Sequence, residues 1–237
     1  MKCKYFKHTD AFWVLMGRVT EILRDSSSDI WERILKHPFI VELFRGSLPL
    51  EKFKFYVIQD YNYLVTLTRC QAMIASKLEE PAIIRRVLEL ALADVSTELE
   101  NYNKLLNALG LSLNDVIRAR PAPTNTAYMN FLLTTCTLGG PYEGLVAILP
   151  CYWTYLEIAR YHEKELTNNP VSIYRDWALV YLSPEYEGIV MDLRRIIDDA
   201  GDDLMHGISR LTSIFRQASI YEFMFWDMAY RMEQWAI

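Results

Sequence analysis

The chain has 237 residues, of which 51% are hydrophobic and 23% are charged, and this composition excludes a largely disordered protein. Its formal net charge of −5 provides no general attraction for phosphate backbones or anionic membrane surfaces, so we expect no nucleic acid and no membrane as partners. We expect residues 1–237 to fold as a single domain around one hydrophobic core.

The N-terminal segment does not have the pattern of a secretion signal, because its apolar run AFWVLMG is short, follows Asp10 and ends in charged residues. No apolar stretch reaches the length of about 20 residues that crosses a bilayer. The four cysteines have no zinc-binding spacing and are expected to be reduced thiols. These features predict a soluble, cytoplasmic protein.

Apolar residues recur at intervals of three and four along the chain, which is typical of amphipathic helices. In the first half, one helix is predicted to begin at the N-cap Asp29, with Glu32 as its capping partner, and the next runs from Pro38 to Gly46. Two long helices follow, at 49–78 and at 82–109, the second ending at Gly110. A short helix then starts with Ser112 and Asp115.

The second half continues the same pattern after the loop RARPAPTN. The first predicted helix is capped by Thr124 or Asn125 and stops at Gly139 and Gly140. It is followed by helices at 141–166, 170–181, 184–199 and 203–235. Period-two alternation and hairpin signals are absent. We therefore predict an all-α fold, built as a helical bundle.

Two of the helical stripes are interrupted by a carboxylate where an apolar residue is expected. Asp60 occupies the step between Val57 and Leu64, and Glu222 fills the corresponding gap before Phe225. Because ionised carboxylates are costly to bury without partners, each of them must be satisfied by another group. Helix caps, tyrosine hydroxyls or arginines would do this in a purely structural role.

A thiol shares a helix face with a phenol, because Cys151 precedes Tyr155 by one turn. The proline before it has two interpretations. If the helix from 141 runs through Pro150, the proline kinks it. If a helix restarts at Pro150, Cys151 lies in the first turn, where the helix dipole favours a thiolate.

Each of these residues, taken alone, is more often structural, and a single buried cysteine is usually core filling. Asp60, Glu222 and Cys151 lie on three different helices, and together they favour a shared pocket. Helix bundles build ligand sites from inward-facing side chains of facing helices. Tyr63 and Phe225, each near one of the carboxylates, would provide an aromatic lining.

Six segments, in order, carry a resemblance to a known family: HPF, GSLPLEKFKFYVIQDYNYL, PTNTAYMNFL, ILPCYWTYLEI, YRDWALVY and YEFMFWDMAY. Across nearly its whole length the chain resembles the TenA/thiaminase II family, in its cysteine-containing branch. The resemblance implies a heme-oxygenase-like all-α fold, a homotetramer, and no requirement for heme or metal as a cofactor.

The resemblance also implies hydrolysis at the exocyclic methylene of a 4-amino-2-methylpyrimidine, in thiamin salvage. The aminomethyl pyrimidine would give the hydroxymethyl compound, and thiamin would give that pyrimidine plus the thiazole. In this role the catalytic residues are Cys151, Glu222 and Asp60, and the substrate-binding residues are Tyr63, Tyr128, Tyr155, Tyr181 and Phe225. Which of the two compounds is the physiological substrate stays open.

Other functions fit the residues less well. A di-iron oxidase needs two Glu-x-x-His pairs, and a heme protein needs a distinctive axial histidine, which none of the four histidines offers. His37 is expected to cap its helix and His162 to lie in the core or at an interface. Tyr102 stands where some relatives carry a histidine, and no role is assigned to it. The remaining alternative is a non-catalytic pyrimidine-binding or regulatory protein on the same fold.

Overall fold

The computed structural model describes residues 18–236, apart from the side chains of residues 96–101, 103 and 202. No strand occurs in this range, so the predicted all-α fold is confirmed. The helices are α2 Val19–Asp25, α3 Ser28–Leu35, α4 Pro38–Arg45, α5 Leu50–Ala75, α6 Pro81–Leu109, α7 Leu113–Arg118, α8 Pro123–Leu138, α9 Pro141–Tyr161, α10 Glu163–Leu166, α11 Ser172–Val180, α12 Pro184–Asp199, α13 Gly201–Met205 and α14 Ile208–Arg231. Most of the N-terminal segment assessed above as a signal lies outside the described residues.

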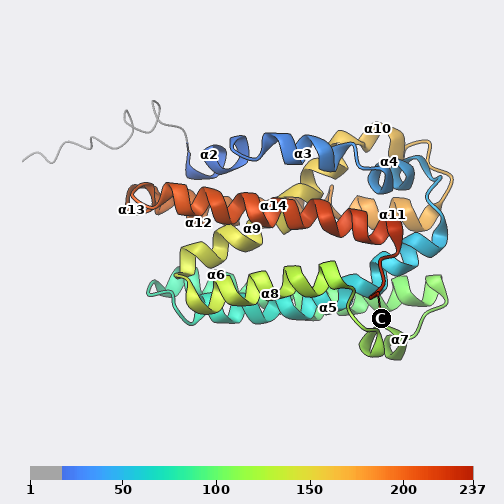
Figure 1. The fold of residues 1–237 in the computed structure, drawn as a ribbon, viewed down its shortest axis with the longest axis horizontal. Coiled ribbons are helices and arrows are strands. Elements are labelled where there is room, and N and C mark those ends of the chain that lie inside the picture. Colours follow the sequence, from blue (N-terminus) through green and yellow to red (C-terminus); the bar gives the residue numbers. More distant parts are fainter. Residues whose placement is uncertain (1–17, 237) are drawn as a thin grey trace, which may run out of the picture.

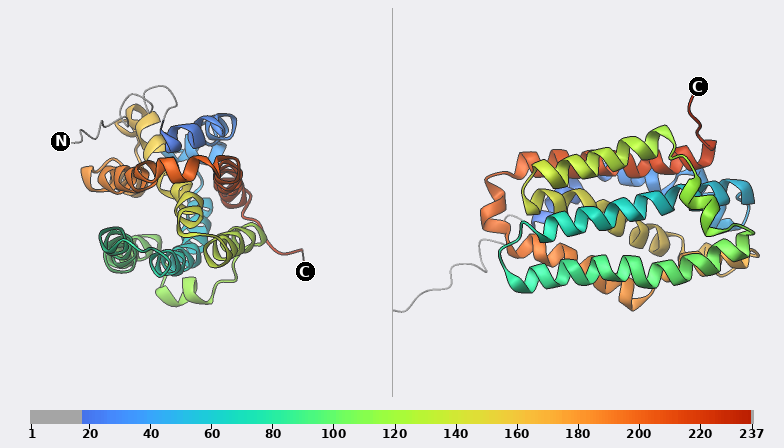
Figure 2. Two further views of the ribbon diagram at one scale, coloured as in Figure 1. Left: turned by 90° about the vertical axis from the view of Figure 1, so that its left-hand side faces the viewer. Right: turned by 90° about the horizontal axis from the view of Figure 1, so that it is seen from below.

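The helices form a bundle in three layers (Figures 1 and 2). Helices α2, α3 and α4 lie along one side, α5, α6 and α8 lie along the opposite side, and α9, α12 and α14 run between them. Helix α9 packs against α3, α5, α8, α12 and α14. The centre of the bundle is therefore α9, the helix that carries Cys151.

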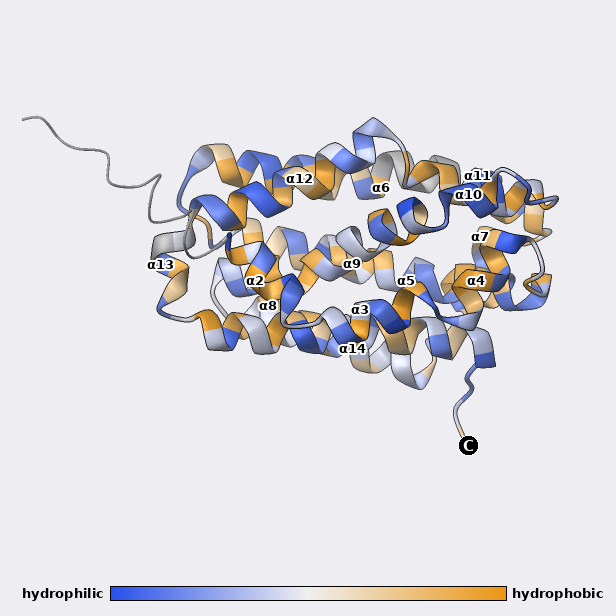
Figure 3. Cartoon of the chain, turned by 90° about the horizontal axis from the view of Figure 1, so that it is seen from above, coloured by the Kyte–Doolittle hydropathy of each residue, from blue (hydrophilic) through white to orange (hydrophobic). Residues whose placement is uncertain are grey.

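The position of α9 follows from its composition. The run from Gly144 to Pro150 is buried, as is the run from Tyr152 to Leu156, so the helix is enclosed on almost every side. A helix that is apolar all round belongs in a core. Helix α12, which lies in the same layer, instead alternates polar and apolar residues around its circumference (Figure 3).

Helix α9 is continuous through Pro150, which lies inside it. The interpretation in which a helix restarts at Pro150 is therefore wrong, and Cys151 is not in a first turn. Thr154 donates a hydrogen bond from Oγ1 to the Pro150 carbonyl oxygen at 2.8 Å. Cys151 thus gains nothing from a helix N-terminus, whose effect is confined to the first turn.

Several predicted helix ends are confirmed. His37 is the N-cap of α4 and accepts a hydrogen bond from the Phe39 backbone at Nδ1. Gly46 ends α4 with a φ of +75°, and Ser112 forms a capping box with Asp115. His162 is buried, as expected, and its Nε2 lies 2.7 Å from the Leu35 carbonyl oxygen.

Two predicted N-caps are wrong. Helix α3 begins at Ser28, and Asp29 lies in its first turn, where its carboxylate pairs with Arg216 at 2.7 Å. Helix α8 begins at Pro123, before Thr124 and Asn125. Proline at the first helical position has its φ already set for the helix, and this outweighs the capping preference of the residues that follow.

Two long helices predicted in the second half are interrupted. The predicted helix 141–166 breaks at His162 into α9 and α10, and 203–235 breaks at Gly207 into α13 and α14. Helix α14 ends at Arg231, before Met232, whose φ of 49° is left-handed. The hydrophobic period continues across both breaks, which is why the period alone could not locate them.

Candidate active site

A small cavity opens between α5, α6, α9, the first turn of α12 and Tyr181, which follows α11. Its volume of about 40 Å³ has room for water but not for a heterocyclic ring. Five of the predicted site residues form part of its wall: Asp60, Tyr63, Cys151, Tyr155 and Tyr181. The thiol and the first carboxylate predicted from the sequence therefore meet at one cavity.

The other predicted site residues lie one layer behind this wall. The Tyr63 ring packs against Tyr128, with ring centroids 5.0 Å apart, and against Phe225, at 5.7 Å. Tyr128 donates a hydrogen bond to Glu222 Oε1 at 2.6 Å. Glu222 itself does not line the cavity, so the second carboxylate is separated from it by aromatic side chains.

Helical spacing on α5 and α9 explains how four of these groups converge. Asp60 and Tyr63 are three residues apart on α5, and Cys151 and Tyr155 are four apart on α9, so each pair shares a face. The two helices pack against each other. Facing pairs on adjacent helices thus enclose the cavity from two sides.

Burial controls the protonation of Glu222, whose side chain is only 3% exposed. It raises the pKa of this carboxyl to about 7, the hydrogen bond from Tyr128 and the nearby Thr154 hydroxyl lower it, and the charge of Asp60 raises it. A carboxyl group that titrates near neutral pH can both hold and release a proton under physiological conditions.

Asp60 differs from Glu222 in having no hydrogen-bond or ion-pair partner within residues 18–236. Burial alone raises the pKa of Asp60 to about 7. Part of its surface faces the cavity, and it forms no hydrogen bond or ion pair with the residues that the structure describes. Its carboxyl group is therefore available to a ligand.

Cys151 is a thiol rather than a thiolate in the free protein. Burial raises its pKa most, and the charges of Glu222, Asp60 and Asp94 raise it further, while the Tyr63 hydroxyl lowers it. A thiolate among carboxylates would suffer repulsion in a region of low polarity. A nucleophilic role for Cys151 therefore requires a ligand that changes this balance.

The Tyr63 hydroxyl is buried and has no partner in hydrogen-bonding geometry within residues 18–236. It lies close enough to the Cys151 thiol to affect its pKa, although the two groups do not form a regular hydrogen bond. A buried hydroxyl without a partner is costly, and such a cost is commonly recovered when a ligand binds.

Besides the apolar Leu64 and Leu67, sequence reasoning missed four polar residues of the cavity wall: Tyr56, Asp94, Tyr152 and Tyr186. Tyr56 lies one turn before Asp60, and its hydroxyl is 3.1 Å from the Tyr155 hydroxyl, so the helical period was a signal for it. No comparable signal points to the other three, because they reach the cavity from α6, from a second face of α9 and from α12.

Tyr102, which was given no role, lies outside this cavity. Its hydroxyl donates a hydrogen bond to the Val57 carbonyl oxygen, and its ring is tilted against Tyr61. It helps to line a second small cavity next to the first. In the described part of the chain, Tyr102 thus packs α6 against α5.

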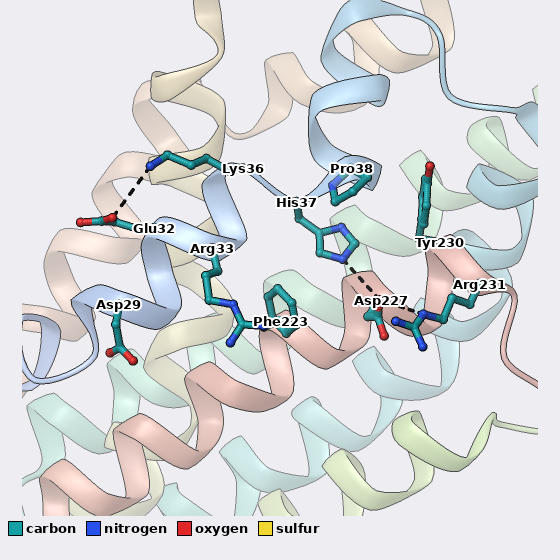
Figure 4. Close-up of a pocket in the computed structure, with 10 residues that line it drawn as sticks. All are labelled: Asp29, Glu32, Arg33, Lys36, His37, Pro38, Phe223, Asp227, Tyr230 and Arg231. Atoms are coloured by element: carbon teal, nitrogen blue, oxygen red, sulfur yellow. Dashed lines mark ion pairs between the residues drawn. The ribbon is translucent and has the colours of Figure 1, made fainter.

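A larger and more open pocket of about 640 Å³ lies elsewhere, between α3, α4 and α14 (Figure 4). His37 Nε2 is 3.8 Å from Asp227, which also pairs with Arg231 at 3.1 Å. Burial lowers the pKa of His37 to about 4, so this histidine is neutral. The pocket contains neither the thiol nor the two carboxylates, and we do not assign the predicted chemistry to it.

Two further absences hold for the part of the chain that the structure describes. No group of three histidine, cysteine, aspartate or glutamate side chains is arranged to hold a metal ion. Among residues 18–236, no helix is both long enough and apolar enough to cross a membrane.

Comparison with known proteins identifies relatives over almost the whole chain. The aminopyrimidine aminohydrolase of Helicobacter pylori is 28% identical over 215 residues, which cover 90% of this chain and 99% of the relative. The aminopyrimidine aminohydrolase of Bacillus subtilis is 28% identical over 221 residues, covering 92% of each.

Solved structures agree with these relatives. A TenA homologue from P. horikoshii superimposes with a TM-score of 0.87 at 51% identity and covers 91% of this chain and 99% of its own. A domain of unknown function from Shewanella denitrificans, described as having a heme oxygenase-like fold, has a TM-score of 0.75 at 14% identity, covers 92% of this chain and 94% of its own, and confirms the predicted fold. The model of the TENA/THI-4/PQQC family matches residues 24–232. The chain therefore belongs to the TENA/THI-4/PQQC family.

Proposed function

We propose that this protein is an aminopyrimidine aminohydrolase of the thiaminase II type, acting in thiamin salvage through a covalent intermediate on Cys151. The observation that carries the proposal is the meeting of the Cys151 thiol and the unpaired Asp60 carboxyl at one aromatic cavity, with Glu222 one layer behind. The names of the Helicobacter pylori and Bacillus subtilis relatives support this class of reaction.

In the proposed mechanism, the thiolate of Cys151 adds to a carbon of the pyrimidine ring and interrupts its aromaticity. The electrons of the 4-amino nitrogen then expel the leaving group from the exocyclic methylene. Water adds to that methylene, and release of Cys151 restores the aromatic ring. The net change replaces the leaving group by a hydroxyl group.

The two carboxyl groups have different roles in this mechanism. Glu222, with its pKa near 7, protonates or hydrogen-bonds a ring nitrogen and makes the ring more electrophilic. Asp60, which has no partner among the described residues, accepts a hydrogen bond from the 4-amino group and orients the ring. The tyrosines place the water, and Phe225 stacks on the ring.

The size of the cavity sets a requirement for this mechanism. Because the space of about 40 Å³ is too small for the ring, side chains of the wall must move when the substrate enters. Movement of the Tyr63 ring, which packs on both Tyr128 and Phe225, would connect the cavity with Glu222. We also propose that the whole chain acts as one domain in a cytoplasmic homotetramer.

The test is to offer the purified protein both thiamin and 4-amino-5-aminomethyl-2-methylpyrimidine, and to measure kcat/KM for each. We expect turnover of at least one compound and a mass increase on Cys151 when the reaction is stopped early. The Cys151→Ser variant should fold normally and lose at least about a thousandfold in kcat. Full activity in that variant would exclude the covalent step, and no turnover by the unaltered protein would favour a binding or regulatory protein.

A further inference from the structure

The ionisable side chains around the catalytic cavity are all acids. Asp60 and Asp94 both line it, Glu222 is close enough to influence Cys151, and the described residues of its wall include no lysine, arginine or histidine. A cavity with this lining favours a ligand that carries positive charge and disfavours an anion.

Asp94 is the one of these carboxyl groups that the mechanism above does not use. Its Oδ2 accepts a hydrogen bond from the Tyr152 hydroxyl at 2.6 Å and another from Gln71 Nε2 at 2.7 Å. Both bonds go to the same oxygen, and Oδ1 accepts none from any group that the structure describes. The side chain is therefore held in place by one oxygen while the other is left for a ligand.

The location of Asp94 fits a position beside the departing group. Asp94 and Leu64 line both the catalytic cavity and the adjoining cavity of about 40 Å³ that includes Tyr61 and Tyr102. They form the shared boundary between the two spaces. A substituent that points from the catalytic cavity toward α6 would reach this boundary, and the second space lies beyond it.

An independent observation supports a polar ligand in this cavity. Tyr63 is 4% exposed and lines the same wall, and its hydroxyl has no hydrogen-bond partner among the described residues. Burying this hydroxyl without a hydrogen bond is costly, so a ligand that supplies a partner is favoured.

We propose that Asp94 is a further substrate-binding residue, which holds the positively charged substituent on the exocyclic methylene of the pyrimidine. This inference rests on the proposed function, because it uses the chemistry of the proposed substrates. An aminomethyl group is protonated at neutral pH as other alkylamines are, and the thiazolium of thiamin carries a permanent charge. The hydroxymethyl product has no charge at this position.

A cation at Asp94 has two consequences for the reaction. It distinguishes substrate from product, because only the substrate gains a charged hydrogen bond or ion pair, and the product is released more easily. It also offsets the negative charges that oppose ionisation of Cys151, so the thiolate forms when the cationic substrate is present. The neutral thiol of the free protein is then the expected resting state.

The test compares two ligands that share the ring and differ in charge at the methylene. Binding of 4-amino-5-aminomethyl-2-methylpyrimidine and of its hydroxymethyl counterpart is measured by calorimetry in Cys151→Ser protein, which prevents turnover, with and without Asp94→Asn. Asparagine keeps the shape and one acceptor oxygen for Tyr152 and Gln71. We expect the aminomethyl compound to bind at least about tenfold more weakly and the hydroxymethyl compound to change by less than about twofold.

Two further variants make the result specific. Tyr152→Phe removes one of the donors that hold Asp94, and we expect a smaller loss, about threefold, again only for the aminomethyl compound. It serves as the deciding variant if Asp94→Asn does not fold. Asp176→Asn changes an exposed aspartate on α11 and should alter neither affinity.

The outcomes separate the inference from the proposed function. Equal weakening of both compounds would mean that Asp94 only supports the fold, and unchanged affinities for both would mean that it does not bind the cation. Either result overturns the inference while leaving the proposed function intact. If the Cys151→Ser protein binds neither compound and the unaltered protein turns over neither, the proposed function fails, and the inference fails with it.

Discussion

The substitution Glu222→Gln tests whether burial controls the protonation of the second carboxyl group. Glu222 is 3% exposed, and burial raises its pKa from 4.5 to about 7. Since one pKa unit corresponds to about 1.4 kcal/mol, ionising Glu222 in the folded protein costs about 3 kcal/mol more than in the unfolded chain.

This cost has a definite dependence on pH. Between pH 4.5 and about 7 the folded protein holds a proton on Glu222 that the unfolded chain releases, so the folded state binds more protons. The stabilisation is complete below pH 4.5 and is lost as the pH rises through about 7. The free energy of unfolding of the unaltered protein should therefore fall across this range, and Asp60, with its pKa also near 7, should add to the fall.

Glutamine at position 222 cannot ionise and can still accept the hydrogen bond from Tyr128. We expect the fall in unfolding free energy between about pH 5 and pH 8 to be smaller in Glu222→Gln by up to about 3 kcal/mol. Urea unfolding followed by circular dichroism, at constant ionic strength, measures this difference. The exposed Glu79 provides the control, since Glu79→Gln should leave the pH dependence unchanged.

The same experiment on Tyr128→Phe tests the physical cause. The Tyr128 hydroxyl lowers the pKa of Glu222, so its removal should move the fall to higher pH. If Glu222→Gln and the unaltered protein lose equal stability between about pH 5 and pH 8, Glu222 is already ionised and well solvated at the lower pH. The reasoning that makes it a proton donor near neutrality would then be wrong.

Two predictions concern the fold and the assembly. Gly46→Ala should lower the unfolding free energy more than Gly110→Ala, by at least about 1 kcal/mol in urea unfolding, because both have positive φ but only at Gly46 would a new Cβ lie 2.5 Å from Asn169 Oδ1. Equal losses would show that Asn169 can move at little cost. Leu92→Glu should reduce the proposed tetramer to smaller species in sedimentation, because Leu92 is 63% exposed on α6 beside the exposed Leu88. Leu138→Glu, at an exposed site on α8, should leave the tetramer intact. An unchanged tetramer in Leu92→Glu would place the interface on another surface.

The periodicity of the sequence was sufficient to predict the fold class and the inward direction of Asp60 and Glu222. Helical periodicity is a local property, because which residues share a face depends only on their spacing along one helix. The same property paired Cys151 with Tyr155 and would have found Tyr56. The resemblance to a family, rather than periodicity, added Tyr128 and Tyr181 to the predicted site.

Helix ends were predicted less well, because several local preferences compete at each of them. Pro123 determines the start of α8 although Thr124 and Asn125 are better capping residues, and Asp29 leaves its predicted capping position to pair with Arg216. The breaks at His162 and Gly207 interrupt no hydrophobic pattern. The packing of neighbouring helices decides where such a helix ends, and the sequence of one helix contains no information about that packing.

By itself the sequence determined that this protein is a helical bundle and that two carboxylates and a thiol face its interior. Only the tertiary structure decided that Asp60 and Cys151 share a cavity wall, that Glu222 stands one layer behind it, and that Asp94 joins the wall from α6. The physical reason is that the distance between side chains on different helices depends on the angle and register at which those helices pack. That packing results from the burial of the whole core rather than from any one segment.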